Sequence, residues 1–237
     1  MKFSKQKLEE VASNSLYTTM TNSRTISYSG DIAKRFIPNT KSILEYGPAE
    51  GLMTSQLIKL FDRYVIVEGS KRYCDELEKK FPSAIIINGL FENTHLNEKF
   101  DFIVLGHVLE HVEDPVQVLR MVANHMHENT IVFCAVPNAN SVHRLAAVEM
   151  GLMQTEFDMS EKDIHHGHMR IYKLKSLISD FESAGLMVKK TGGYWLKPIS
   201  DSQIEKSWTQ EMLDGFMKLG EKFPEIAAEI YVVAIKK

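Results

Sequence analysis

The sequence predicts a doubly wound, mostly parallel α/β sheet, formed by a single domain that spans residues 1–237. Apolar runs of strand length alternate with polar stretches of helical periodicity, which is the pattern of strand–helix–strand units. The first run ends in an acid and a glycine-containing turn, and the next run ends in a second acid. With 237 residues and 44% hydrophobic content, the chain can bury one sizeable core.

Five apolar runs predict the central strands, at residues 43–46, 64–68, 84–88, 102–106 and 130–136. Because apolar residues dominate these runs without alternating with polar ones, we expect the strands to be buried on both faces, as in a parallel sheet. The pattern changes after Pro137. From there the chain predicts a helix at 174–184 that Gly185 stops, a strand at 185–194, an amphipathic helix at 202–221 and a strand at 229–236.

The turn after the first run predicts a site for a nucleotide-like cofactor. It contains Gly47 and Gly51, which allow the chain to turn sharply beneath a ligand, and helical periodicity resumes at 52–60. Glu68 closes the second run, where a carboxylate can accept both hydroxyls of a ribose. The Gly-x-Gly-x-x-Gly spacing of a dinucleotide site, which points a helix N-terminus at a pyrophosphate, does not fit this turn.

The turn resembles motif I of the class I S-adenosylmethionine-dependent methyltransferases, with Glu45, Gly47, Ala49 and Gly51 at the acid and glycine positions and Ala49 in place of the middle glycine. Glu45 suits the cationic methionyl amino group of that cofactor. Three later segments extend the resemblance: residues 85–92, residues 100–112 with a Glu-His pair followed by Asp114-Pro115, and residues 169–174. The match is closest to small-molecule enzymes similar to those of the ubiquinone pathway.

This resemblance implies a Rossmann-like sheet of seven strands whose last strand is antiparallel beside strand six. It also implies S-adenosylmethionine as cofactor. The residues expected to bind the cofactor are Tyr28, Glu45, Tyr46, Gly47, Pro48, Ala49, Gly51, Glu68, Gly69, Gly89, Leu90, Phe91, Gly106, His107 and Val108. Three segments are expected to cover the acceptor: an N-terminal helical lid at 1–36 and insertions at 138–170 and 198–224.

Composition excludes several other classes of protein. The net charge of −3 and the pI near 6.3 offer no general attraction to a polyanion, so we expect no nucleic-acid partner. Cys74 and Cys134 have no neighbour at metal-ligand spacing, and we expect buried thiols in a reducing cytoplasm. No run approaches membrane-spanning length, and the first residues lack the apolar core of a signal peptide. The oligomeric state is left open.

Nine histidines are many for this length, and most gather in the predicted site loops. Histidine can take a proton at neutral pH, which a hydroxyl acceptor must lose during methyl transfer. The candidate bases are His107, His111 and His166. Packing of His111 beneath the cofactor is the alternative.

A second group of residues is expected to bind the acceptor: Tyr17, His143, His165, His168 and Arg170. Arg170 would pair with an anionic group of the substrate. The alternatives are a solvated loop with Arg170 paired to a nearby acid, and core packing of the two N-terminal tyrosines, Tyr17 and Tyr28. If they are not core residues, the rings of Tyr17 and Tyr28 would close over the cofactor or its sulfonium through a cation–π contact.

The sequence 107–111 would place His107, Glu110 and His111 on one face of a helical turn, which is a possible metal face. Ubiquinone-pathway and small-RNA-terminus methyltransferases carry Glu-x-x-Glu-His here and use it to bind a divalent ion. Because His107 replaces the first carboxylate, which a hard ion prefers, we expect no metal.

The sequence thus predicts methyl transfer from S-adenosylmethionine to a small-molecule acceptor, at a hydroxyl oxygen. Three alternatives remain: an N-methyltransferase acting on a small amine, a metal-assisted RNA-terminus O-methyltransferase, and a non-catalytic module that binds S-adenosylmethionine. The segments expected to cover the acceptor have the least recognisable sequence pattern, so the sequence does not identify the acceptor.

Overall fold

The computed structural model describes residues 9–10, 12–13, 19–39 and 41–237. In this part of the chain, one seven-stranded sheet has the order β3-β2-β1-β4-β5-β7-β6. The strands are β1 (Ser42–Tyr46), β2 (Arg63–Glu68), β3 (Ile85–Asn88), β4 (Phe100–Gly106), β5 (Met126–Pro137), β6 (Leu186–Tyr194) and β7 (Glu229–Lys236). Only β7 runs against the others, and it pairs with both β5 and β6. The predicted fold and the antiparallel last strand are therefore confirmed.

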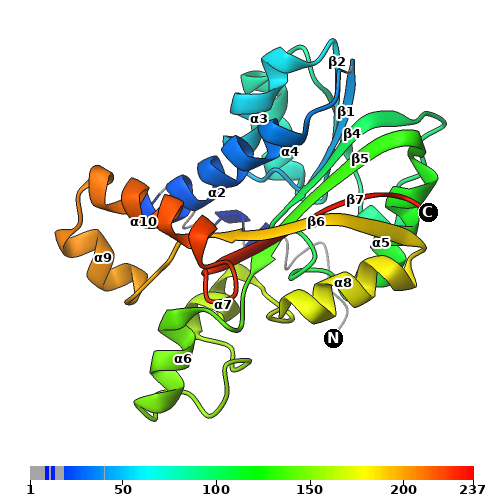
Figure 1. The fold of residues 1–237 in the computed structure, drawn as a ribbon. Helices are drawn as coiled ribbons and strands as arrows, with labels where there is room; N and C mark the ends of the chain where they lie inside the picture. The colour runs from blue at the N-terminus through cyan, green and yellow to red at the C-terminus, as the bar shows by residue number, and fades with distance from the viewer. Residues whose placement is uncertain (1–8, 11, 14–18, 40) are drawn as a thin grey trace.

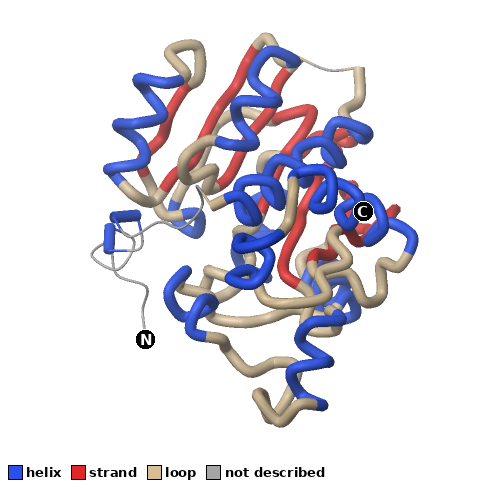
Figure 2. Tube along the Cα trace, turned by 90° about the vertical axis from the view of Figure 1, so that its left-hand side faces the viewer, coloured by secondary structure: helices blue, strands red, loops and turns tan. Residues whose placement is uncertain are grey.

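Helices cover both faces of the sheet (Figure 1). The first layer consists of α2 (Met20–Ala33), α3 (Leu52–Leu57), α4 (Lys71–Lys80) and α10 (Gln210–Lys222). The second layer consists of α5 (Pro115–Asn124) and α8 (Leu174–Ser183). The helices α6 (Val142–Glu149), α7 (Glu161–His166) and α9 (Asp201–Ser207) lie beyond one end of the strands. Figure 2 shows the same arrangement from the side, with the strands as one twisted layer.

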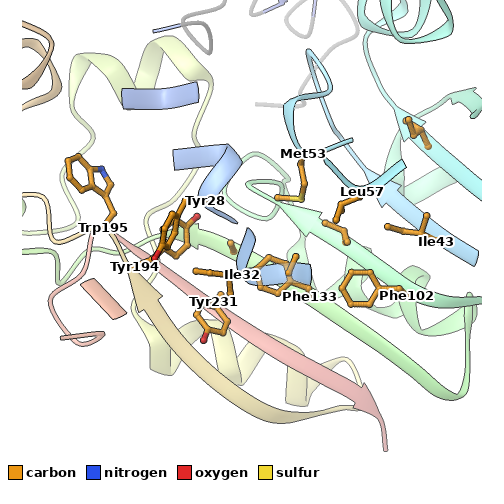
Figure 3. Close-up of a cluster of buried hydrophobic side chains, with 14 of the residues drawn as sticks. Tyr28, Ile32, Ile43, Met53, Leu57, Phe102, Phe133, Tyr194, Trp195 and Tyr231 are labelled. Atoms are coloured by element: carbon orange, nitrogen blue, oxygen red, sulfur yellow. The ribbon is translucent and has the colours of Figure 1, made fainter. Parts of the chain in front are cut away.

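Two apolar clusters hold the sheet between these layers. Successive residues of a strand point to opposite faces, so Ile43 belongs to the first cluster and Leu44 to the second, and both are fully buried. Phe102 and Ile103 divide in the same way. Figure 3 shows part of the first cluster, in which side chains from α2, α3 and the strands meet. Burial of each such side chain contributes about 1.5–3 kcal/mol, which explains why the apolar runs form interior strands.

Capping residues set where several helices begin. Ser70 accepts a hydrogen bond from the Tyr73 amide at the start of α4. Asp114 does the same for the Gln117 amide, and Pro115 occupies the first turn of α5. The Asp-Pro pair that the sequence analysis singled out therefore starts a helix.

The expected helix at 202–221 is wrong, because the segment forms two helices, α9 and α10. Trp208 leaves the helical conformation between them and packs against Trp195 and Phe216, with ring centroids 5.9 and 4.7 Å apart. Thr209 then caps α10 by accepting a hydrogen bond from the Met212 amide. No helix among the described residues is long and apolar enough to cross a membrane.

Candidate functional site

The turn between β1 and α3 is tight, and its glycine is required. Gly47 has φ +57°, and a Cβ atom there would lie 3.0 Å from the ring of Phe91 and 3.3 Å from Val108. Ala49 is also left-handed, with φ +49°, and its amide donates to Glu68 Oε2 at 3.2 Å. The turn therefore joins the carboxyl ends of β1 and β2 and leaves no room for a side chain at Gly47.

Glu68 lies at the end of β2, as predicted, and its carboxylate faces a cavity. Oε1 accepts from the Ser70 amide at 2.8 Å and Oε2 from the Ala49 amide. The side chain is buried, and this burial raises the pKa of Glu68 to about 7. Each oxygen has a second lone pair, so the carboxylate can still accept bonds from a ligand.

The cavity beside Glu68 has a volume of about 590 Å³. It is lined by Glu68, Gly69, Leu90, Phe91, Glu92, Asn93, His111, Val112, Glu113, Asp114 and Gln117. A carboxylate next to apolar side chains suits a nucleoside, whose sugar offers hydroxyls and whose base offers an apolar face. Gly89 does not line this cavity, and a Cβ atom there would lie 2.7 Å from Thr94 Oγ1.

A narrow second cavity lies beneath the glycine turn. It is lined by Ile26, Glu45, Gly47, Pro48, Ala49, Met53, Gly106 and His107. Glu45 Oε2 accepts from the hydroxyls of Thr54 and Tyr64, each at 2.6 Å, and burial raises the pKa of Glu45 to about 7. Tyr46 and Val108 line none of these cavities. Tyr46 is core, because its hydroxyl meets His125 Nδ1 at 2.9 Å and its ring packs edge-on against Phe91.

A third cavity, which we call the polar pocket, has a volume of about 130 Å³. Its charged and imidazole lining residues are His107, Glu110, His111, His143, Arg144, Lys162, Asp163, His166, His168, Lys197, Asp201 and Glu229. Ile26 and His107 also line the narrow cavity, and His111 also lines the large one. The two histidines that follow β4 therefore stand where the three cavities adjoin.

His107 contacts three side chains at the wall of the polar pocket. Its Nε2 lies 3.2 Å from the Tyr194 hydroxyl, and its Nδ1 lies 3.3 Å from Glu110 Oε1 and 3.8 Å from Glu229 Oε2. Burial disfavours the charged imidazole, but the two carboxylates outweigh it, so the pKa of His107 is raised. The expected helical face at 107–111 is wrong. His107 is left-handed, with φ +58°, residues 107–111 form a turn, and α5 begins only at Pro115.

Glu110 and Glu229 are buried carboxylates, and the protein does not supply hydrogen bonds to all of their oxygens. Both oxygens of Glu110 and Oε2 of Glu229 lack a hydrogen-bond donor among the described residues. Burial raises the pKa of Glu229 to about 7. For Glu110, burial is outweighed by the nearby histidines, which lower its pKa. Buried acceptors without donors at a cavity wall are suited to a ligand that supplies the donors.

A profile of the methyltransferase-domain family matches residues 23–191. The chain belongs to this family. The match covers the sheet from β1 to most of β6, together with α2 and the turn after β1. It confirms the expectation that the chain is a methyltransferase. No curated protein matches the sequence.

Solved structures share the fold of this methyltransferase at low sequence identity. The N-methyltransferase NodS from Bradyrhizobium japonicum, solved with S-adenosylhomocysteine, is 12% identical, with TM-score 0.63 and coverage of 98% of this chain and 97% of its own. A possible histamine N-methyltransferase from Thermotoga maritima is 16% identical, with TM-score 0.62 and 91% of each chain covered. A S-adenosylmethionine-dependent methyltransferase from Mesorhizobium loti is 12% identical, with TM-score 0.63 and 87% and 96% covered.

The methyltransferase brings three possible metal ligands together. Donor atoms of Glu110, His111 and His168 lie within 4.8 Å of one another, and no other such group occurs among the described residues. The His111 and His168 rings are 4.8 Å apart, and His168 Nδ1 is 3.2 Å from Asp163 Oδ1. Burial lowers the pKa of His111 to about 4, so its imidazole is neutral at pH 7. The expectation of no metal stays a prediction.

Several expected acceptor residues take other places in the methyltransferase. Arg170 does not line the polar pocket, since it donates to the carbonyls of Leu109 and Glu113, at 3.3 and 2.9 Å, and braces the turn after β4. His165 is exposed and lies outside the lining. His143, His166 and His168 do line it, and burial lowers the pKa of His143 to about 2 and of His166 to about 3.

The hypotheses for the two N-terminal tyrosines have different outcomes. Tyr28 packs in the core against Tyr194, with ring centroids 5.7 Å apart, and its hydroxyl donates to Glu221, so core packing is the correct alternative for it. Tyr17 lies outside the described residues.

The sequence analysis missed six charged residues of the polar pocket: Arg144, Lys162, Asp163, Lys197, Asp201 and Glu229. One signal could have found Glu229. It is the first residue of a strand predicted to be antiparallel, which places it at the same sheet edge as the ends of β4 and β5. Lys197 and Asp201 follow β6 without any recognisable motif.

Proposed function

We propose that the protein transfers a methyl group from S-adenosylmethionine to a hydroxyl oxygen of a small molecule in the polar pocket, with His107 as the base. The observation that carries this proposal is the position of His107, which lines both the polar pocket and the narrow cavity beneath the glycine turn. In-line transfer requires the acceptor and the methyl group to meet where two such cavities join.

The described residues fit the cofactor at three points. Glu68 would accept both ribose hydroxyls, and Leu90 and Phe91 offer apolar walls to the adenine. Gly47 leaves the backbone open where a Cβ atom would contact Phe91 and Val108. Glu45, in the narrow cavity, would balance the cationic methionyl amino group.

The cofactor supplies an electrophilic methyl group on a positively charged sulfur. With the cofactor bound, the acceptor oxygen would form a bond to this carbon while the carbon–sulfur bond breaks and leaves its electron pair on sulfur. The hydroxyl proton would pass to Nε2 of His107, because Nδ1 faces the carboxylates of Glu110 and Glu229. Glu110 and Glu229, at 3.3 and 3.8 Å from Nδ1, stabilise the imidazolium that results. They also make His107 a stronger base than an isolated histidine.

His111 and His166 remain candidate bases of lower rank. Their pKa values, lowered by burial to about 4 and about 3, keep both rings neutral at pH 7 but make them poor proton acceptors. His111 also contacts the large cavity, where it can pack beneath the cofactor.

Replacement of His107 tests the proposal. We choose His107→Asn, since asparagine tolerates the left-handed backbone found at this position. Turnover should fall roughly 10²- to 10⁴-fold, while the affinity for S-adenosylhomocysteine changes little. The wild-type rate should rise with pH through a pKa above that of an ordinary histidine, and this rise should vanish in the variant. Near-normal turnover of His107→Asn would disprove the role of this base.

Transfer to the nitrogen of a small amine is the second candidate. Glu110 and Glu229 favour it, because three of the four oxygens of these buried carboxylates lack a hydrogen-bond donor among the described residues and could hold an ammonium group. Two proteins of the same fold are described as an N-methyltransferase and a possible histamine N-methyltransferase. Mass spectrometry of the products from a panel of hydroxyl and amine acceptors separates the two candidates.

We further infer that the reaction needs no metal ion and takes place in the cytoplasm. The sulfonium already supplies the electrophile, so no Lewis acid is required. The polar pocket has a volume of only about 130 Å³, which favours a small molecule over an RNA terminus. Both cysteines are free and buried, in keeping with a reducing compartment.

A further inference from the structure

The charged residues of the polar pocket form two groups of opposite sign. The first group is Glu110 and Glu229, which flank His107. The second group is Lys162 and Lys197, which share the single carboxylate of Asp201. A further pair, Arg144 and Asp163, is internally balanced, with Nη1 and Oδ2 3.1 Å apart.

The lysine group carries one positive charge in excess. Lys197 Nζ lies 2.7 Å from Asp201 Oδ1, and Lys162 Nζ contacts Oδ2 of the same carboxylate. Lys162 Nζ also donates to Asn22 Oδ1 at 2.7 Å, which adds no charge. Within ion-pair distance, two ammonium groups thus face one carboxylate, and Glu229 acts on Lys197 only from a greater distance.

Burial makes this excess charge costly. The side chains of Lys197 and Asp201 are only 12% and 16% exposed. An ammonium group has three N–H donors, and Asp201 is the one carboxylate paired with Lys197 in the described part of the chain. An anion in the pocket would complete the hydrogen bonds of Lys197 and neutralise the pair of lysines.

We propose that the acceptor is a small hydroxylated anion whose carboxylate or phosphate group binds to Lys162 and Lys197. This inference rests on the proposed function, because it places the acceptor hydroxyl at His107. The charges fix the orientation: an anionic group is repelled by Glu110 and Glu229 and attracted by the lysines, so the hydroxyl end turns to His107. Lys162 on α7 lies in the 138–170 insertion expected to cover the acceptor, and Asp201 lies in the 198–224 insertion, which Lys197 directly precedes.

Matched probes with and without an anionic group test the proposal. Protein saturated with S-adenosylhomocysteine is titrated with sn-glycerol 3-phosphate and with glycerol, and then with 3-hydroxybutyrate and with 1,3-butanediol. Calorimetry gives the affinities, and tryptophan fluorescence reports occupancy, because Trp195 lines the polar pocket. At least one anionic probe should bind 10-fold or more tightly than its neutral partner.

Three variants locate the anion site. Lys197→Met should remove the preference for the anionic probe, whereas Asp201→Asn should strengthen it, since it leaves two uncompensated lysines. Lys206→Met removes the same charge from an exposed position on α9 and should change nothing. The opposite effects of the first two variants cannot arise from misfolding, and binding of S-adenosylhomocysteine confirms that each variant is folded.

The outcomes separate this proposal from the proposed function. Equal binding of the anionic and neutral probes, or an anion preference that survives Lys197→Met, overturns the anion site and leaves methyl transfer at His107 intact. An anion preference that depends on Lys197, together with full turnover of His107→Asn, keeps the anion site and overturns the proposed base.

Discussion

Glu68→Gln provides the sharpest test of the cofactor site. The carboxylate oxygens already accept from the Ala49 and Ser70 amides at 3.2 and 2.8 Å, and each keeps one lone pair for a ribose hydroxyl. Glutamine retains one oxygen acceptor but loses the second and loses the charge. Because hydrogen bonds to a charged group contribute about 1.5–3 kcal/mol, the dissociation constant should rise roughly 10- to 150-fold.

The pH dependence of the same variant gives a second readout. Only the ionised carboxylate offers both oxygens as acceptors, and the pKa of Glu68, raised by burial, is about 7 in the cofactor-free protein. The affinity gap between wild type and Glu68→Gln should therefore be widest at pH 8 and close as the pH falls through about 7.

Calorimetry with S-adenosylhomocysteine at several pH values measures both effects. Glu76→Gln, an exposed acid on α4 that pairs with Arg72, is the matched control and should bind like wild type. Glu68→Ala is a poorer choice, since it leaves the Ala49 and Ser70 amides without their acceptor and so weakens the fold as well. An unchanged affinity of Glu68→Gln at pH 8 would refute the assignment of this acid to the ribose.

Three further predictions concern the metal, the buried acid of β7 and the insertion. Activity should survive EDTA, and a loss that manganese, magnesium or zinc restores would instead assign a metal to Glu110, His111 and His168. Burial raises the pKa of Glu229 from 4.5 to about 7, so the wild type loses stability as the pH rises through 7. Glu229→Gln should then be more stable than wild type by roughly 3 kcal/mol at most at pH 8 and equal to it at pH 4, as thermal unfolding would measure. Arg144→Met should lower the free energy of unfolding in denaturant by about 3–5 kcal/mol, because it leaves the buried Asp163 without its arginine. The control is Arg72→Met, which breaks an exposed ion pair and should lower that free energy by less than about 1 kcal/mol.

The cofactor half of the site could be predicted because its signals are local. A strand, a tight turn and an acid at the next strand end follow one another closely in sequence, so Gly47 and Glu68 were placed correctly at the carboxyl edge. Backbone hydrogen bonds of the parallel strands then fix their positions relative to each other.

The acceptor half could not be predicted in the same way, because its residues come together only through long-range packing. Lys197 and Asp201 line the polar pocket because of the path that the chain takes after β6, and no sequence motif predicts that path. From its sequence context, Arg170 is predicted to bind an anion. Its guanidinium instead donates hydrogen bonds to two main-chain carbonyls of the turn after β4. His107 adopts a left-handed backbone that its residue type does not indicate.

The insertion of β7 between β5 and β6 has a consequence for folding. Because β7 follows both of its neighbours in sequence and pairs between them, β5 and β6 each have an unpaired edge until residues 229–236 insert. Glu229 is the first residue of that strand, so the half of the sheet that carries the cofactor turn can assemble before His107 has its second carboxylate. A refolding chain should therefore recover S-adenosylhomocysteine binding earlier than it recovers turnover.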